Sequence, residues 1–367
     1  MKPNCDFSGS YLPADVTFLL KPVSIVETDV VEKERAIQSG KRHYSEMLSV
    51  EKTPDKRYME LFYRALEQNK VKFAGHIASL ARTLALRPGK EVVVVSLARA
   101  GTPVGVLLHR ALGMLGRQSV HYSISIIRDR GVDREALDYI LERHADTDVV
   151  FLDGWTGKGA ISTELHATIA DYNASRGTHL DPALVVVSDL AGVAGLAATS
   201  DDYLIPSAIL NAIVSGLVSR TVLNDDYVKP GDFHACMFYA DKVGEDLSRY
   251  FVDLLTPIMA ASLADIAASP VCIWGPQQRQ ALKRNSDDFI AAAMPRWGVT
   301  DRNRVKPGIG ESTRALLRRV PDRLIVRDQD AADVEHLVTL AKTHGVTIEL
   351  EPELPYRAAV IIKTLGE

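Results

Sequence analysis

The chain has 367 residues, which is enough for two or three domains with a sizeable core. A hydrophobic fraction of 46%, a charged fraction of 25% and a net charge of −4 describe an ordinary globular protein, so the chain as a whole is not a basic nucleic-acid binder. Three cysteines are too few, and odd in number, for a disulfide framework. With no signal-peptide pattern and no apolar run of bilayer length, we expect a soluble cytoplasmic protein.

Apolar strands alternate with helices after a first stretch, residues 1–55, that shows no clear pattern. Residues 57–87 carry apolar side chains at helical spacing, and a Pro-Gly pair ends that helix. Further helices are predicted at 134–144 and after the loop at 153–159, and strands at 91–98, 119–127, 148–152 and 183–190. The strands are apolar on both faces, which predicts an α/β fold with a mostly parallel, Rossmann-like sheet between helices. The glycine-bearing loops at 98–105 and 153–159 then lie beyond the carboxyl ends of strands, where such sheets bind ligands.

The composition changes near residue 300. Between residues 302 and 327, eight Lys or Arg stand against Glu311 and Asp322, a local net charge of +6. A strand, a helix and a further strand follow, which predicts a small α/β module of about 65 residues. We therefore divide the chain into a sheet domain with an N-terminal extension at 1–240, a helical extension at 241–300 and a C-terminal module at 301–367.

The stretch DGWTGKGAI begins at Asp153 and combines an acid, a glycine-rich loop and the start of a helix. Backbone N–H groups of such a loop and the helix N-terminus favour a phosphate, and Asp153 suits the hydroxyls of an adjacent ribose. The expected phosphate ligands are Thr156, Gly157, Lys158 and Gly159. A nucleoside-triphosphate P-loop is excluded because only two residues separate the first glycine from the Gly-Lys pair. A tight strand-to-helix turn is the alternative.

Two further loops follow predicted strands. In SLARAGTPVG, the planar guanidinium of Arg99 suits phosphate oxygens. Together with Ala100, Gly101 and Thr102 it resembles the loop that binds pyrophosphate in phosphoribosyltransferases. In SIIRDRGVD, Arg128 and Asp129 are candidates for clamping pyrophosphate, holding magnesium or contacting the nucleophile. The alternatives are an exposed surface charge for Arg99 and a solvated turn with local ion pairs for the later loop.

This order of loops resembles the phosphoribosyltransferase family, in which an acid-tipped strand and a Thr/Gly-rich loop hold phosphoribosyl pyrophosphate. More specifically, the chain resembles the StiP-like phosphoribosyltransferase-like proteins encoded with bacterial tellurite-resistance and stress-response systems. The resemblance covers nearly the whole chain and is carried by GSYLPADVTFLLKP, SGKRHYSEML, SLARAGTPVG, HYSISIIRDRGVD, DGWTGKGAI and the C-terminal module. The chain departs from the transferase pattern at Gly154, where a second acid is usual. Some members of the StiP-like family also carry a cysteine-protease label.

The resemblance implies a transferase that uses phosphoribosyl pyrophosphate and Mg²⁺ to modify an unknown base-like or small acceptor. Cations would neutralise the pyrophosphate leaving group as positive charge develops on the ribose. The catalytic residues expected for this reaction are Asp153, Arg99, Arg128 and Asp129, and no particular metal ligands are assigned. A homodimer is compatible with this interpretation, and no membrane partner is expected.

The cysteines raise a different possibility, a thiol hydrolase. His234 and Cys236 stand two residues apart and share a face if they lie on a strand. A buried structural cysteine is the more frequent outcome for such a pattern. Cys5 lies in an expected mobile terminus, and Cys272 has the surroundings of a core residue. No Cys/His spacing suggests zinc.

The C-terminal module begins with KPGIGESTRALLRR, which resembles the RNA-binding signature of Pelota and L7Ae-like domains. That resemblance implies RNA contacts from the N-terminus of a helix and its basic residues. The expected RNA-binding residues are Lys306, Gly308, Gly310, Glu311, Arg314 and Arg318. Gly310 stands where the signature carries Asn. A domain-docking face or an ordinary solvated helix is the alternative, and an RNA-binding adaptor that senses a nucleotide without turnover is the second functional hypothesis.

Overall fold

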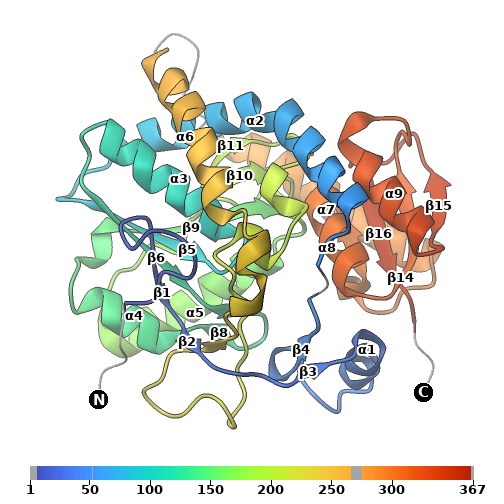
Figure 1. The fold of residues 1–367 in the computed structure, drawn as a ribbon, viewed down its shortest axis with the longest axis horizontal. Helices are drawn as coiled ribbons and strands as arrows, with labels where there is room; N and C mark the ends of the chain where they lie inside the picture. Colours follow the sequence, from blue (N-terminus) through green and yellow to red (C-terminus); the bar gives the residue numbers. More distant parts are fainter. Residues whose placement is uncertain (1–5, 52, 266–274, 365–367) are drawn as a thin grey trace.

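The computed structural model describes residues 6–51, 53–265 and 275–364. Its centre is a parallel sheet of six strands in the order β1-β6-β5-β9-β10-β11 (Figure 1). All five neighbouring pairs in this sheet are parallel. The strands are β1 (Thr17–Leu19), β5 (Val92–Leu97), β6 (Ser119–Ile124), β9 (Val149–Thr156), β10 (Leu184–Asp189) and β11 (Leu196–Thr199). The predicted α/β class with a mostly parallel sheet is therefore confirmed.

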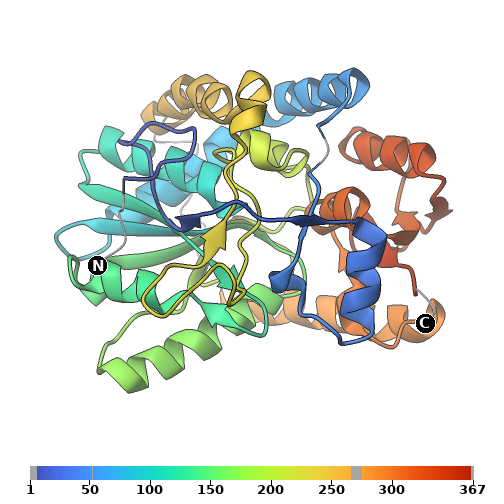
Figure 2. The same cartoon turned by 60° about the horizontal axis from the view of Figure 1, so that its bottom comes forward.

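Helices cover both faces of this sheet, as the alternation of its buried side chains requires. Val94 of β5 and Leu152 of β9 belong to the core under one set of helices, whereas Val95 and Phe151 belong to the core on the opposite face. The first set is α2 (Lys56–Ala85), α3 (Gly101–Met114) and α6 (Ser248–Ala264), and the second is α4 (Arg134–Leu141) and α5 (Ala160–Arg176). Figure 2 shows the sheet between these two layers.

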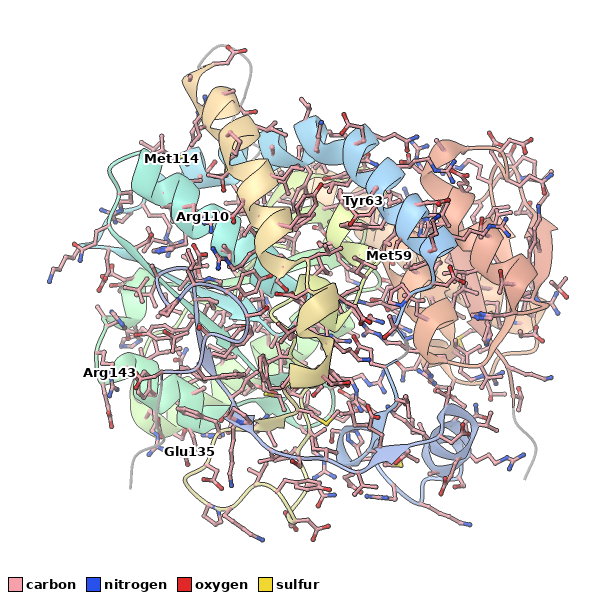
Figure 3. The ribbon with its side chains drawn as sticks, in the orientation of Figure 1. Met59, Tyr63, Arg110, Met114, Glu135 and Arg143 are labelled. Carbon is pink, nitrogen blue, oxygen red and sulfur yellow. The ribbon has the colours of Figure 1, made fainter. Side chains whose placement is uncertain are left out.

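Short elements at the N-terminus tie distant parts of the sheet domain together. They are β2 (Lys21–Pro22), β3 (Glu27–Thr28), α1 (Val30–Gln38) and β4 (Leu48–Ser49). Three more short strands occur later in the sequence: β7 (Ile126–Ile127), β8 (Gly131–Val132) and β12 (Ala235–Cys236). Strand β12 pairs with β2, and β1 adds the edge strand to the sheet. Arg110 of α3, labelled in Figure 3, bonds Asp15 at 2.7 Å and Asp253 of α6 at 2.8 Å. This arginine therefore holds the N-terminal segment and α6 against α3.

The C-terminal module is a mixed four-stranded sheet in the order β13-β16-β14-β15. Its elements are β13 (Val305–Pro307), α8 (Ile309–Arg318), β14 (Pro321–Val326), α9 (Glu335–Thr343), β15 (Thr347–Leu350) and β16 (Ala358–Ile362). Helix α7 (Pro276–Arg296) packs Phe289 and Ile290 into the core of this module, beside Val305 and Ile325. The segment 241–300 therefore divides between α6 on the sheet domain and α7 on the module. In the described part of the chain, no helix is long and apolar enough to cross a membrane.

Candidate functional site

The predicted loop at 153–159 is in part strand, because β9 extends to Thr156 and only residues 157–159 lie between it and α5. This stretch is held by the protein itself. Asp153 is buried and accepts a hydrogen bond from the N–H of Gly154 at 2.7 Å. Burial raises the pKa of Asp153 to about 6, against the lowering effect of Arg314 and of that N–H. The hydroxyl of Thr156 donates to Asp189 at 2.6 Å, and Asp189 also accepts the backbone N–H groups of residues 191, 193 and 194. The predicted phosphate ligand Thr156 thus serves to order the end of β10.

The C-terminal module covers this loop. Lys158 donates to the carbonyl oxygens of Arg302 at 2.6 Å and Val305 at 3.1 Å. A Cβ at Gly157 would lie 2.5 Å from Cγ of Glu311, so a larger residue here would displace the Glu311 side chain. Gly159 has a φ of 81° and leads into α5. The described geometry makes this loop the surface on which the module docks.

The same contact partly buries the predicted RNA-binding signature. Gly308, at a φ of 82°, precedes α8, and a Cβ at Gly310 would lie 2.3 Å from Cε2 of Trp155. Arg314 stacks over the Trp155 ring at 4.4 Å from its centroid. Glu311 faces Lys306 at 3.8 Å and Arg314 at 3.7 Å. Gly310 and Arg314 therefore contact Trp155 of the sheet domain, while the side chains of Arg314 and Glu311 stay 29% and 25% exposed.

The predicted pyrophosphate loop is closely packed. Arg99 is 8% exposed and donates to the carbonyl oxygen of Val218 and to Glu51, each at 2.7 Å. Gly101 and Thr102 begin α3, with Ala100 as its N-cap residue. The hydroxyl of Thr102 contacts that of Ser123 at 2.8 Å. Arg99 is therefore a buried ion-pair partner, and its predicted alternative as a free surface charge is wrong.

The third loop stays near the surface. The backbone N–H of Arg128 donates to the hydroxyl of Tyr44 at 2.7 Å, and its guanidinium lies 5.1 Å from the centre of that ring. Asp129, with 65% of its side chain exposed, contacts Arg128 at 3.2 Å and His43 at 3.8 Å. The charge of Arg128 contributes to a lowered pKa at Lys158 and at Lys306, although burial is the main cause for both. The structure thus brings this loop toward the docking surface as a further source of positive charge.

Sequence reasoning missed two residues, Glu51 and Arg220, that line the same cavity as Arg99 and Arg318. Glu51, from the stretch without a clear pattern, accepts hydrogen bonds from Arg99 and from the N–H of Ala212. Arg220 donates to the carbonyl oxygens of Tyr44 and Met47. Neither residue belongs to a motif, so no local signal could have identified them.

The thiol candidate lies inside the protein. Cys236 on β12 is fully buried, and burial raises the pKa of its thiol. The ring of His234 contacts the hydroxyl of Ser125 at 2.9 Å, and its backbone N–H donates to Asp133 at 2.6 Å. Among the described residues, Cys236 is the free cysteine, and no hydrogen bond joins it to His234. Cys5 and Cys272 lie outside the described residues.

Metal ligands do not gather in the part of the chain that the structure describes. Within residues 6–51, 53–265 and 275–364, no group of three or more His, Cys, Asp or Glu side chains is placed to hold a metal ion.

Comparisons with known proteins identify relatives of both parts of the chain. The family model described as "Tellurite-like stress resistance cysteine protease StiP" matches residues 9–256, and the "PELOTA RNA binding domain" matches residues 284–364. A curated protein named "Cysteine protease StiP", from Acinetobacter baylyi (strain ATCC 33305 / BD413 / ADP1), is 41% identical over 372 residues, which cover 98% of this chain and 95% of that protein.

One solved structure with a weak likeness is a hypoxanthine phosphoribosyltransferase from Trypanosoma cruzi, complexed with the product IMP. It is 15% identical, has a TM-score of 0.27, and covers 50% of this chain and 89% of its own. A likeness of this size carries no argument about function.

The predicted Mg²⁺-dependent phosphoribosyl transfer is wrong, because the family and its curated member are described as cysteine proteases. The prediction that the enzyme is a phosphoribosyltransferase is wrong for the same reason.

Proposed function

The chain belongs to the StiP family of tellurite-like stress-resistance proteins, and we propose on this basis that it is a cysteine-dependent peptidase. The observation that carries this proposal is the match to a curated cysteine protease along 98% of the chain. The resemblance to this family noted in the sequence is confirmed, and the proteolytic label that accompanied it now supports the leading function.

Peptide hydrolysis by a thiol makes specific demands on the protein. A thiolate attacks the peptide carbonyl carbon, an acyl thioester forms as the amine leaves with a proton, and water then releases the acid and restores the thiol. The thiol must reach substrate and must ionise near neutral pH. Cys236 meets neither demand in this structure, because it is buried, burial raises the pKa of its thiol, and it has no hydrogen bond to His234. The proposal therefore does not depend on a preformed Cys236–His234 pair.

The decisive experiment compares the three single cysteine-to-serine variants on a labelled protein substrate such as casein. We expect iodoacetamide to abolish hydrolysis, and one serine variant to lose at least about 1,000-fold in kcat without losing its folded state. We expect Cys236→Ser to keep its activity per folded molecule. Hydrolysis that survives both iodoacetamide and all three substitutions would contradict the proposal.

Loss of turnover in both Cys236→Ser and His234→Ala, at unchanged stability, would instead assign the reaction to these two residues. It would also require a conformation in which Cys236 is exposed. Mass spectrometry of the alkylated peptide identifies the reacting cysteine independently of turnover, and an unfolding curve for each variant separates a catalytic loss from a folding defect.

The Pelota match favours a second function, RNA binding by the C-terminal module. The helix α8 that carries the signature faces Trp155 and Gly157, so we expect the full chain to bind structured RNA only weakly. Fluorescence anisotropy at 50 and 200 mM salt measures this, because phosphate contacts weaken steeply with salt. Arg314→Ala should lower the affinity, whereas Arg296→Ala, at a half-exposed position near the end of α7, serves as the matched control. Tight binding that is insensitive to Arg314→Ala would contradict this use of the signature.

A further inference from the structure

A cavity of about 780 Å³ lies between the sheet domain and the C-terminal module. Its walls come from the segment before α2, the loop around residues 209–213 and the end of α8. These elements are separated in sequence but lie side by side in Figures 1 and 2. The volume falls within the range of sites that hold nucleotides and other small molecules.

Positive charge dominates the described lining of this cavity. Eight Lys or Arg line it against three Asp or Glu, a net charge of +5. Three arginines from different parts of the chain reach it: Arg99 after β5, Arg220 before β12, and Arg318 at the end of α8. Arg99 has a carboxylate partner, Glu51 at 2.7 Å. Arg220 donates to two backbone carbonyl oxygens, and Arg318 donates to the side-chain oxygen of Asn211.

The three guanidinium groups keep unused hydrogen-bonding capacity. Nε of Arg99, one terminal nitrogen of Arg220 and Nε of Arg318 are buried without a hydrogen-bond partner in the described part of the structure. Donors that are both charged and buried are unfavourable unless an acceptor meets them. Burial and the neighbouring arginines also lower the pKa of Arg220, to about 10, and lower that of Arg318. An anion bound in the cavity would supply acceptors for these nitrogens and would offset the positive charge.

The rest of the wall indicates what that anion carries. Apolar side chains also line the same cavity, among them Tyr58, Ile209, Leu210, Leu316 and Leu340. Inorganic phosphate or pyrophosphate would leave this apolar lining unused, whereas an aromatic base could cover it. Guanidinium groups suit phosphate oxygens, which they meet with two parallel N–H groups.

We propose that this interdomain cavity binds a nucleoside polyphosphate, with its phosphates on Arg99, Arg220 and Arg318 and its base against the apolar wall. The ligand would join the two domains, because Arg318 belongs to the C-terminal module and the other two arginines to the sheet domain. ADP binding is measured without any thiol reaction, so either proposal can fail without the other.

Isothermal titration calorimetry of the full chain with ADP, inorganic pyrophosphate and adenosine tests the site. We expect ADP to bind more tightly than either fragment, because only ADP occupies both sides of the cavity. Arg318→Gln and Arg220→Gln should weaken ADP binding about 10- to 100-fold, the usual effect of losing a hydrogen bond to a charged group. Arg296→Gln, which removes an arginine outside the cavity, should leave the affinity unchanged.

Thermal unfolding distinguishes a ligand contact from a purely structural role. Without ligand, Arg318→Gln should unfold at the wild-type temperature or above it, because the change removes an uncompensated charge. Its stabilisation by ADP should be lost. If the glutamine variants fail to fold, Arg318→Lys decides the matter, since it keeps the charge but loses the planar fork and should bind ADP more weakly than wild type.

Three results would overturn the proposal: no ADP binding at millimolar concentration, equal affinity in wild type and folded arginine variants, or displacement of the ligand only by structured RNA. The last result would assign the arginines to an RNA backbone.

Discussion

Asp202 of the sheet domain caps a helix of the C-terminal module, and its removal should loosen the contact between the two. The N-cap residue of α8, Gly308, has no side chain to accept the free N–H groups of the first turn. One carboxylate oxygen of Asp202 accepts the N–H of Ile309 at 2.9 Å, and the other accepts the N–H of Arg357 at 2.8 Å. Asp202→Ala leaves both donors without this acceptor.

The cost follows from these two contacts. Each buried N–H left without a partner costs about 1–3 kcal/mol, and loss of an N-cap alone costs about 0.5–2 kcal/mol. Because water partly replaces the lost acceptor at this partly exposed position, we expect a total of about 2–4 kcal/mol. For one-step unfolding of a chain of this size, that is a fall in Tm of about 3–5 °C. Calorimetry at pH 7.5 measures it, with Asp201→Ala as the control, since Asp201 is exposed and contacts Lys72.

The difference between wild type and Asp202→Ala should also depend on pH. Burial raises the pKa of Asp202 from 3.8 to about 6, although both N–H groups lower it. As pH falls from 7 toward 4, the folded protein takes up this proton before the unfolded chain does, so wild type gains stability that the alanine variant cannot gain. The cost of Asp202→Ala should therefore be larger at pH 4.5 than at pH 7.5, by at most about 3 kcal/mol. Equal Tm values for the two proteins at pH 7.5, or a cost that shrinks toward acid pH, would refute this role.

Three further substitutions test the contacts around the glycine-rich loop. The pKa of Asp153 is raised to about 6 in the folded protein, so wild type should lose stability as pH rises through about 6, and Asp153→Asn should lose less. Urea unfolding at pH 5 and at pH 7.5 measures this. The same difference in unfolding free energy between wild type and variant at both pH values would contradict it. Gly310→Ala should cost about 1–3 kcal/mol and alter Trp155 fluorescence, while Gly244→Ala, which has open space around it, should do neither. Asp189→Ala should cost more than about 3 kcal/mol in urea unfolding, because four donors lose this acceptor and only the N–H of Ala191 keeps another, the hydroxyl of Thr156; a cost below about 1 kcal/mol would count against that network.

The sequence contained enough information to predict the sheet but not its full extent. Runs such as 92–97 are β-branched and apolar at every position, and their alternate residues enter the two cores on opposite faces. Strand β1 was not predicted, because Thr17–Leu19 is too short to give a pattern and depends on pairing with β6, about a hundred residues later in the chain. The order of the strands in the sheet likewise depends on pairing between segments that are far apart in the sequence, so local patterns do not predict it.

The surroundings of the predicted binding loops were harder to predict than the fold. The two glycine-bearing loops do lie at the carboxyl ends of β5 and β9, as parallel topology requires. Their partners could not be predicted, since Lys158 contacts carbonyl groups at Arg302 and Val305, far along the chain. A local motif indicates which backbone is free to bind an anion, but not whether another domain already covers it.

Gly310 connects the docked arrangement to the departure from the RNA-binding signature. The RNA-binding signature carries Asn at the position that Gly310 occupies in this chain. A Cβ here would lie 2.3 Å from the Trp155 ring, so an Asn side chain would force Trp155 and the stacked Arg314 to move. RNA reading by this face of α8 and docking onto the sheet domain therefore exclude each other. The glycine is what allows the module to close over the loop, and the same closure brings Arg318 to the cavity where it meets Arg99 and Arg220.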